Sequence, residues 1–200
     1  MQISDFKNIH KGEKCIVSGL GVSATEIENY PGVKIIGVND YARLRTPDYL
    51  LVVDKPEAFI KERKEFIINA QAPLFTQCSG WGAFRKFVPI QLGNGPVHEF
   101  QRNQENGVIN HSMTSPYPAV CLAAYMGFTT IALLGVDLTD NHFFANDGTH
   151  VLSKSLLTID DHFGMLRREL ANIGVDFVNL SQISRLKSLR KIDSDDFRKI

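Results

Sequence analysis

Short apolar runs alternate with stretches of helical periodicity along most of the chain. A continuous apolar run bounded by polar residues or glycine predicts a strand that is buried on both faces. Strands are therefore expected at residues 15–18, 34–38, 49–53, 73–77, 130–136 and 175–180. The run at 130–136 is the most apolar, so we expect it at the centre of the sheet.

Helices are expected between these strands, at residues 24–30, 57–68, 116–126 and 158–173. The last of them has a capping signal at its start, apolar residues at helical spacing, and Gly174 as its stop. Residues 116–126 are apolar on nearly every side, which is typical of a buried helix. This alternation predicts an α/β fold: a Rossmann-like, doubly wound, mostly parallel sheet in a single domain.

The regular pattern spans residues 1–180, and two stretches differ from it. Residues 78–112 combine glycines and aromatic residues without periodicity. We expect loops and short strands there, forming a wall or lid beside a site or packing against a second copy of the chain. Residues 181–200 mix six basic residues with three aspartates and are expected to form a peripheral helix that frays.

The composition is that of a globular protein, with 22 Lys and Arg balancing 22 Asp and Glu. Nucleic-acid-binding domains usually carry a basic excess, because neutralising phosphates supplies much of their affinity. Nucleic acid is therefore a disfavoured partner. The sequence shows neither a signal peptide nor a membrane-spanning run, and Cys15, Cys78 and Cys121 lack metal-like spacing. These features favour a cytoplasmic protein with reduced thiols.

The first candidate for chemistry is the glycine turn after the first strand, Gly19-Leu20-Gly21-Val22-Ser23. Glycines let the backbone approach a phosphate or ribose, and the N–H groups at a helix start attract an anion. With Ala24 the segment reads G-x-G-x-x-A, which admits a dinucleotide site. A tight turn that binds nothing is the structural alternative.

Two further polar residues end neighbouring predicted strands, Asn39 after the second and Asp54 after the third. The carboxyl ends of parallel strands meet at one edge of a sheet, where ligands bind. Asn39 would hydrogen-bond a base or ribose and Asp54 a sugar hydroxyl, while in a dinucleotide site Asp40 would hold the ribose. Asn and Asp are also common turn residues.

The helix start at Ser115-Pro116 is a second candidate anion site. Serine is a preferred N-cap and proline a preferred first helical residue. The hydroxyls of Thr114 and Ser115, together with free N–H groups, would bind a phosphate. Simple capping of the helix is an alternative of equal weight.

The loop after the strand at 130–136 is polar, and α/β enzymes often place catalytic groups in such loops. His142 and His150 are candidate general bases, because imidazole titrates near neutrality. With Asp140 they are also a candidate metal site, although their spacing matches no standard one. Asp137 is expected to brace the loop. His111 could face a ligand, and surface or capping positions are expected for the remaining histidines, His10, His98 and His162.

Together these segments resemble a known superfamily. It contains the bacterial lipooligosaccharide sialyltransferases, the archaeal-type 6-hydroxymethylpterin diphosphokinases and the flagellin-modifying motility-associated proteins. The resemblance runs from about Lys14 to Leu180. Its carriers are the turn at 19–23, residues 36–39 and 47–54, Thr114-Ser115, the block 123–138 and Gly148-Thr149-His150.

The resemblance implies a glycosyltransferase whose donor is a nucleotide-activated sugar. It implies the following donor-binding residues: Gly19, Gly21, Ser23, Asn39, Asp54, Thr114, Ser115, Asp137 and Thr139. Asp54 stands where the sialyltransferases have an asparagine that contacts the sugar. A loop histidine deprotonates the acceptor hydroxyl in that family; His150 is its nearest counterpart and His142 the second candidate.

The chain also departs from the family pattern. The usual Gly-x-Gly-Pro-Ser turn is Gly-Leu-Gly-Val-Ser here. Tyrosines that hold the leaving phosphate in the sialyltransferases are replaced by Thr139 and by His142 or Phe143. The identities of the sugar and the acceptor therefore stay open.

The leading hypothesis is a metal-independent glycosyltransferase with a histidine base. It would use a CMP- or UDP-type donor as substrate, a small-molecule or glycan acceptor, and no tightly bound cofactor. One alternative is a pterin-type diphosphokinase using ATP and Mg²⁺, with Asp54, Asp137 and Asp140 as metal ligands. Others are a dinucleotide-dependent oxidoreductase and a non-catalytic nucleotide sensor.

Overall fold

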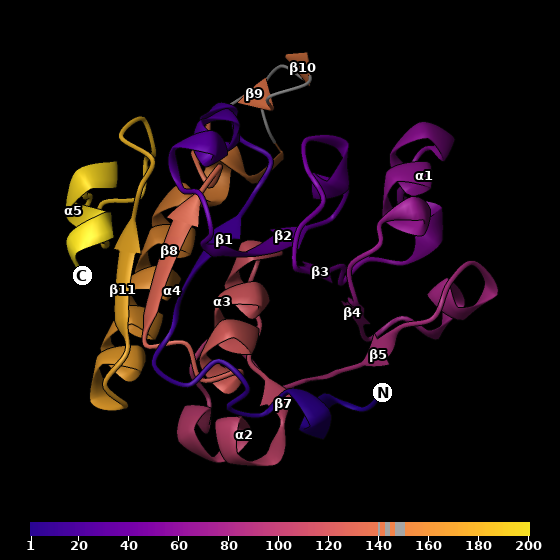
Figure 1. The fold of residues 1–200 in the computed structure, drawn as a ribbon, viewed down its shortest axis with the longest axis horizontal. Helices are drawn as coiled ribbons and strands as arrows, with labels where there is room; N and C mark the ends of the chain where they lie inside the picture. The colour runs from indigo at the N-terminus through magenta and orange to yellow at the C-terminus, as the bar shows by residue number, and fades with distance from the viewer. Residues whose placement is uncertain (140, 143–144, 147–150) are drawn as a thin grey trace.

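The computed structural model describes residues 1–139, 141–142, 145–146 and 151–200. Its centre is a seven-stranded sheet in the order β11-β8-β1-β2-β3-β4-β5, in which every neighbouring pair is parallel (Figure 1). These strands are β1 (Lys14–Ser18), β2 (Lys34–Val38), β3 (Tyr49–Leu51), β4 (Leu74–Thr76), β5 (Val88–Pro89), β8 (Thr130–Leu134) and β11 (Asp176–Asn179). The predicted single-domain, Rossmann-like α/β fold is confirmed.

Helices cover both faces of the sheet, and the strands bury alternate residues on each side. Cys15 and Val17 of β1 face the core that contains α3 and α4, whereas Ile16 faces the core that contains α1 and α5. The helices are α1 (Lys61–Asn69), α2 (Phe100–Asn106), α3 (Pro116–Tyr125), α4 (Leu156–Asn172) and α5 (Ser194–Lys199). Burial on both faces explains why the strands read as continuous apolar runs.

Short 3₁₀ helices and two small sheets complete the described chain. The 3₁₀ helices are η1 (Ile3–Phe6), η2 (Val22–Asn29), η3 (Tyr41–Arg43), η4 (Pro56–Ala58), η5 (Ser79–Ala83) and η6 (Val151–Ser155). The small sheets pair β6 (Gln91–Leu92) with β7 (Val108–Ile109), and β9 (Asn141–His142) with β10 (Ala145–Asn146). The segment 78–112 thus contains η5, β5, β6, α2 and β7.

Several local predictions need correction. The most apolar strand, β8, is second from the sheet edge, and β2 holds the middle position. β8 is nevertheless buried, because α3 and α4 cover it on one side and the C-terminal segment on the other. The expected helix at 24–30 is the 3₁₀ helix η2, where the Thr25 hydroxyl donates to the Val22 carbonyl at 2.9 Å.

The C-terminal segment differs from the single peripheral helix that was expected. Only Ser194–Lys199 is helical, and it lies beside β11 (Figure 1). Leu186, Leu189, Ile192 and Phe197 are buried in the two cores, so the segment packs against the sheet along its length. The prediction rested on the charged residues of the segment and overlooked these four apolar residues, which anchor it to the sheet.

His10 was expected at a surface or capping position, but it is 8% exposed and packs in the core. Its ring stacks on Phe128 with centroids 4.4 Å apart, and its Nε2 lies 2.7 Å from the Tyr49 hydroxyl. Packing against an aromatic ring, with a hydroxyl as partner, satisfies both the apolar and polar parts of the imidazole. No helix among the described residues is long and apolar enough to cross a membrane.

Candidate functional site

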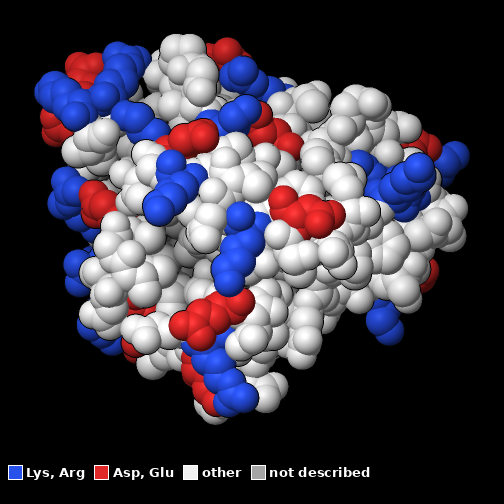
Figure 2. All heavy atoms as spheres, turned by 60° about the horizontal axis from the view of Figure 1, so that its bottom comes forward, with Lys and Arg blue, Asp and Glu red and all other residues white. Residues whose placement is uncertain are grey.

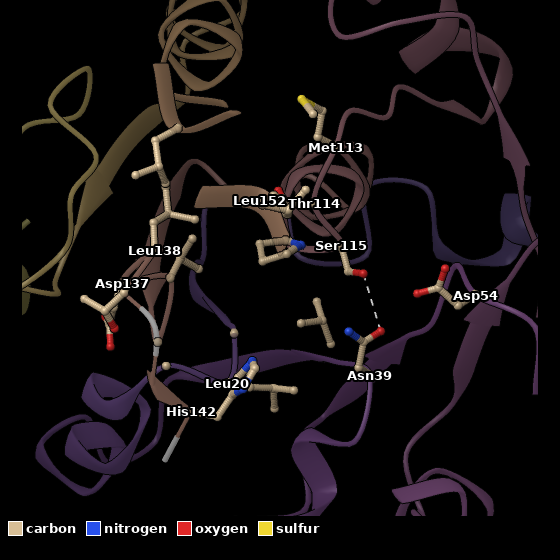
Figure 3. Close-up of a pocket in the computed structure, with 18 residues that line it drawn as sticks. Leu20, Asn39, Asp54, Met113, Thr114, Ser115, Asp137, Leu138, His142 and Leu152 are labelled. Atoms are coloured by element: carbon tan, nitrogen blue, oxygen red, sulfur yellow. Dashed lines mark hydrogen bonds between the residues drawn. The ribbon is translucent and has the colours of Figure 1, made fainter. Parts of the chain in front are cut away.

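A pocket of about 300 Å³ opens at the carboxyl ends of β1, β2, β3 and β8 (Figure 3). Of the predicted site residues, those lining it are Gly19, Gly21, Asn39, Asp54, Thr114, Ser115, Asp137, Thr139 and His142. Ser23 lies behind the wall, and His150 is outside the described residues. The edge of the sheet that the sequence indicated therefore carries a real cavity.

Two glycines allow the loops after β1 and β8 to pack directly against each other. A Cβ on Gly19 would lie 2.4 Å from the Gly135 carbonyl oxygen, and one on Gly21 would lie 2.5 Å from a carboxylate oxygen of Asp137. The N–H of Gly21 also donates to the Gly135 carbonyl at 2.7 Å. The glycines are thus needed for contact between loops, whatever ligand the pocket holds.

The start of η2 is occupied by a carboxylate from the protein itself. Asp137 is 1% exposed and accepts hydrogen bonds from the Ser23 N–H at 2.9 Å and the Ser23 hydroxyl at 2.5 Å. A third donor, the Ser181 hydroxyl, lies 2.6 Å away. In a dinucleotide site the pyrophosphate takes this position. The Asp137 side chain fills it instead.

Asp40, the predicted ribose ligand of a dinucleotide site, is also unavailable. It is fully buried, and Arg63 binds both of its oxygens, at 2.6 and 3.0 Å. Such a bidentate pair satisfies the carboxylate without a ligand. In the described residues, the start of η2 and Asp40 are thus both occupied by partners from the protein. This argues against the dinucleotide site that the oxidoreductase alternative requires.

On the other side of the pocket, Ser115 meets Asn39. The Ser115 hydroxyl donates to the Asn39 side-chain oxygen at 3.4 Å and makes no capping bond to α3 (Figure 3). Asn39 has a φ of 53°, a left-handed conformation that asparagine tolerates well. On this side of the pocket, the contact joins the end of β2 to the start of α3. The capping alternative for Ser115 is thus not what the structure contains.

The start of α3 offers hydroxyls more than backbone donors. Pro116 and Pro118 have no N–H, and the Tyr117 N–H donates to the Thr114 carbonyl at 3.1 Å. The Thr114 hydroxyl oxygen is buried and has no hydrogen-bond partner among the described residues. Buried polar atoms are nearly always paired in native proteins, so this hydroxyl is suited to a ligand.

Thr139, in the loop after β8, repeats this feature. Its hydroxyl oxygen is also buried without a hydrogen-bond partner in the described part of the chain. The preceding residue, Leu138, has a φ of 53°. A branched residue in this conformation carries strain of about 1–3 kcal/mol, and such strain concentrates at functional sites. Both lining threonines thus present unsatisfied hydroxyls.

His142 and Asp54 lie on different sides of the pocket (Figure 3). His142 belongs to β9, and its backbone forms a bridge with Gly21. Asp54 is near Asn39 and Ser115, and its carbonyl accepts a hydrogen bond from the Trp81 indole at 2.9 Å. His111 does not line the pocket; its Nδ1 lies 2.7 Å from the Gly93 carbonyl.

No group of three or more His, Cys, Asp or Glu side chains in the described residues is arranged to hold a metal ion. Asp54 and Asp137 lie on opposite sides of the pocket, and Asp137 is already bound by three donors (Figure 3). The other proposed ligands, Asp140 and His150, lie outside the described residues. The described residues thus give the diphosphokinase alternative no carboxylate cluster.

Sequence reasoning missed the apolar part of the pocket. Its apolar lining residues include Leu20, Val38, Met113, Leu138, Leu152 and Leu156. Leu152 and Leu156 come from η6 and the first turn of α4, far from the strand ends on which the prediction concentrated. The sequence offered no signal for them, because an apolar residue at a helix start is normally read as core.

Comparison with known proteins places the fold among sialyltransferases. No protein-family model and no curated sequence matches the chain. The sialyltransferase CstII from Campylobacter jejuni, solved with cytidine-5'-monophosphate, has 15% identity and a TM-score of 0.56, covering 91% of this chain and 85% of its own.

The α-2,3-sialyltransferase Cst-I from the same organism also has 15% identity, with a TM-score of 0.55 and coverage of 90% and 79%. A third structure, of CstII with a trisaccharide acceptor and CMP, covers 90% of this chain at a TM-score of 0.56. The similarity at this identity is one of fold, and it spans nearly the whole chain.

Proposed function

We propose that this protein is a glycosyltransferase that moves a sugar from a nucleotide-activated donor to an acceptor hydroxyl. The observation that carries the proposal is the pocket at the carboxyl ends of β1, β2, β3 and β8, in which the Thr114 and Thr139 hydroxyls have no hydrogen-bond partner among the described residues. Similarity of fold to sialyltransferases solved with CMP supports a nucleotide as the ligand. The filled start of η2 disfavours a dinucleotide.

The two sides of the pocket would bind different parts of the donor. Asn39, Thr114 and Ser115 would hold the nucleotide, since amide and hydroxyl groups can bind a base, a ribose and phosphate oxygens. Thr139 would contact the leaving phosphate from the opposite loop. Gly19, Gly21, Ser23 and Asp137 would set the shape of this wall through their contacts with one another.

The proposed reaction is a displacement at the anomeric carbon. The acceptor oxygen forms a bond to that carbon while the bond from carbon to phosphate oxygen breaks, and the acceptor proton passes to a histidine. We propose His150 as this base and His142 as the second candidate. Catalysis would consist of positioning and charge stabilisation, so we propose that no metal ion is required.

A thermal-shift screen tests the proposal most simply. CMP, UDP, GDP, ADP, their sugar conjugates and NADH are each added in large excess, because a ligand specific for the folded state raises the melting temperature. We expect one nucleotide and its sugar conjugates to stabilise the protein, and NADH to have no effect. Stabilisation by NADH alone would contradict the proposal.

The base is tested by sugar transfer or donor hydrolysis with His150→Ala and His142→Ala, assayed with EDTA present. A general base contributes roughly 10²–10⁴-fold, so His150→Ala is expected to lose activity by that factor while nucleotide binding persists. His98→Ala is the control, because His98 is exposed and does not line the pocket. Activity that requires Mg²⁺ and releases AMP would favour the diphosphokinase instead.

A further inference from the structure

We infer that the donor sugar bears no carboxylate, and that Asp54 is the residue that selects a neutral sugar. This inference rests on the proposed function and concerns the sugar half of the proposed donor. It comes from one juxtaposition: the Asp54 carboxylate, unpaired among the described residues, at the rim of a pocket whose described lining contains neither Lys nor Arg.

A hydrogen bond fixes the main chain of Asp54, while its carboxylate has no partner among the described residues. The residue follows β3, and its carbonyl is fixed by the Trp81 indole, which is fully buried. Pro56 then begins η4. The Asp54 carboxylate makes no hydrogen bond or ion pair with the described residues, and it lies on the side of the pocket that carries Asn39 and Ser115 (Figure 3).

Two other described aspartates near the pocket, Asp40 and Asp137, already have partners within the protein. Arg63 neutralises Asp40 with two hydrogen bonds. Three hydrogen bonds from two serines satisfy Asp137, whose carboxylate is turned away from the pocket (Figure 3). Of these three described aspartates, Asp54 is thus the one whose charge is left for a ligand.

The described lining of the pocket offers a sugar carboxylate no lysine or arginine with which to form an ion pair. Neither Lys nor Arg is among its described lining residues. The sequence of residues 135–152, which includes all residues outside the described ranges, contains three aspartates and no Lys or Arg. Elsewhere basic and acidic side chains are interspersed, as the face in Figure 2 shows. A donor with a carboxylate on its sugar would meet Asp54 without a compensating Lys or Arg among the described lining residues.

A neutral sugar, by contrast, matches Asp54 directly. An ionised carboxylate is a pure acceptor with two oxygens, and adjacent sugar hydroxyls present two donors. Hydrogen bonds to a charged acceptor are stronger than those between neutral groups. Like charges at a similar distance repel instead, although solvent screens part of this repulsion because Asp54 is exposed.

The test compares donors that share a nucleotide and differ by a carboxylate. The dissociation constants of UDP-glucose and UDP-glucuronate are measured by isothermal titration, and CMP-N-acetylneuraminate is compared with its carboxyl methyl ester. For wild-type protein we expect the carboxylated ligand of each pair to bind about fivefold more weakly. In Asp54→Asn, which keeps the shape and removes the charge, we expect that ratio to fall to within about twofold.

Glu57→Gln is the matched control, because it removes one exposed acidic charge three residues away, outside the pocket lining. It should leave the wild-type ratio unchanged. If a nucleotide binds but its carboxylated conjugate binds as tightly as the neutral one, the inference fails and the proposed function stands. If neither the nucleotides nor their conjugates bind, the proposed function itself fails.

Discussion

The Asp137 carboxylate accepts hydrogen bonds from both the backbone N–H and the hydroxyl of Ser23, two residues that lie 114 positions apart in the chain. The same Ser23 hydroxyl accepts a hydrogen bond from the Gly135 N–H at 2.9 Å. These bonds join the loop after β1 to the loop after β8. They fix one wall of the pocket and fill the start of η2 with a negative charge of the protein's own.

Replacing Asp137 with asparagine should lower the stability of the fold. The amide would face hydrogen-bond donors in a buried site, so we expect the free energy of unfolding to fall by about 3 kcal/mol. Asp160→Asn is the control, because Asp160 accepts two backbone N–H groups at 2.9 Å in a half-buried position. Urea unfolding that gives equal losses for both variants would contradict this role.

The glycine turn should tolerate no side chain. We expect Gly21→Ala to lower the free energy of unfolding by roughly 1–3 kcal/mol, because its methyl group would overlap the Asp137 carboxylate. At Gly80 the nearest atom to an added Cβ lies at 3.4 Å, an ordinary contact, so Gly80→Ala should be nearly neutral. Comparable urea midpoints for the two variants would show that the loops can separate without cost.

The three thiols should differ sharply in reactivity. Burial raises the pKa of the Cys15 and Cys121 thiols well above the ordinary range, while partial burial raises that of Cys78 less. The thiolate is the reactive form, so in native protein a thiol reagent should label Cys78 alone, and faster as the pH rises toward its pKa. Unfolded protein should expose three thiols, and native Cys78→Ser none. Rapid labelling of two native thiols would contradict the packing of α3 on β1.

The sheet was predictable because its signal is local. Apolar runs such as residues 130–134 are buried on both faces and read directly as strands of a parallel sheet. The rule that ligands bind at the carboxyl ends of these strands then brought Asn39 and Asp54 to one edge. Strand position was not predictable, since β8 owes its burial to the C-terminal segment as much as to its neighbours.

The use of the site residues was less predictable than their location. Gly-x-Gly after a strand suggested close approach to a phosphate, but in the structure the close approach is to Gly135 and Asp137. Ser115 at a helix start suggested a cap, but its hydroxyl contacts Asn39. Each outcome depends on a contact between residues far apart in the chain, which no local pattern encodes.

We propose that the pocket beside Ser115 binds the nucleotide of an activated sugar. Isothermal titration of the nucleotide found by thermal shift, with wild type, Ser115→Ala and Ser112→Ala, tests it most directly. Ser112 is the matched control, because its hydroxyl lies 2.6 Å from His162 and outside the pocket lining. We predict one saturable site whose dissociation constant rises about tenfold in Ser115→Ala and stays unchanged in Ser112→Ala. An equal dissociation constant for Ser115→Ala and wild type, or the absence of nucleotide binding to wild type, would contradict this role of the pocket.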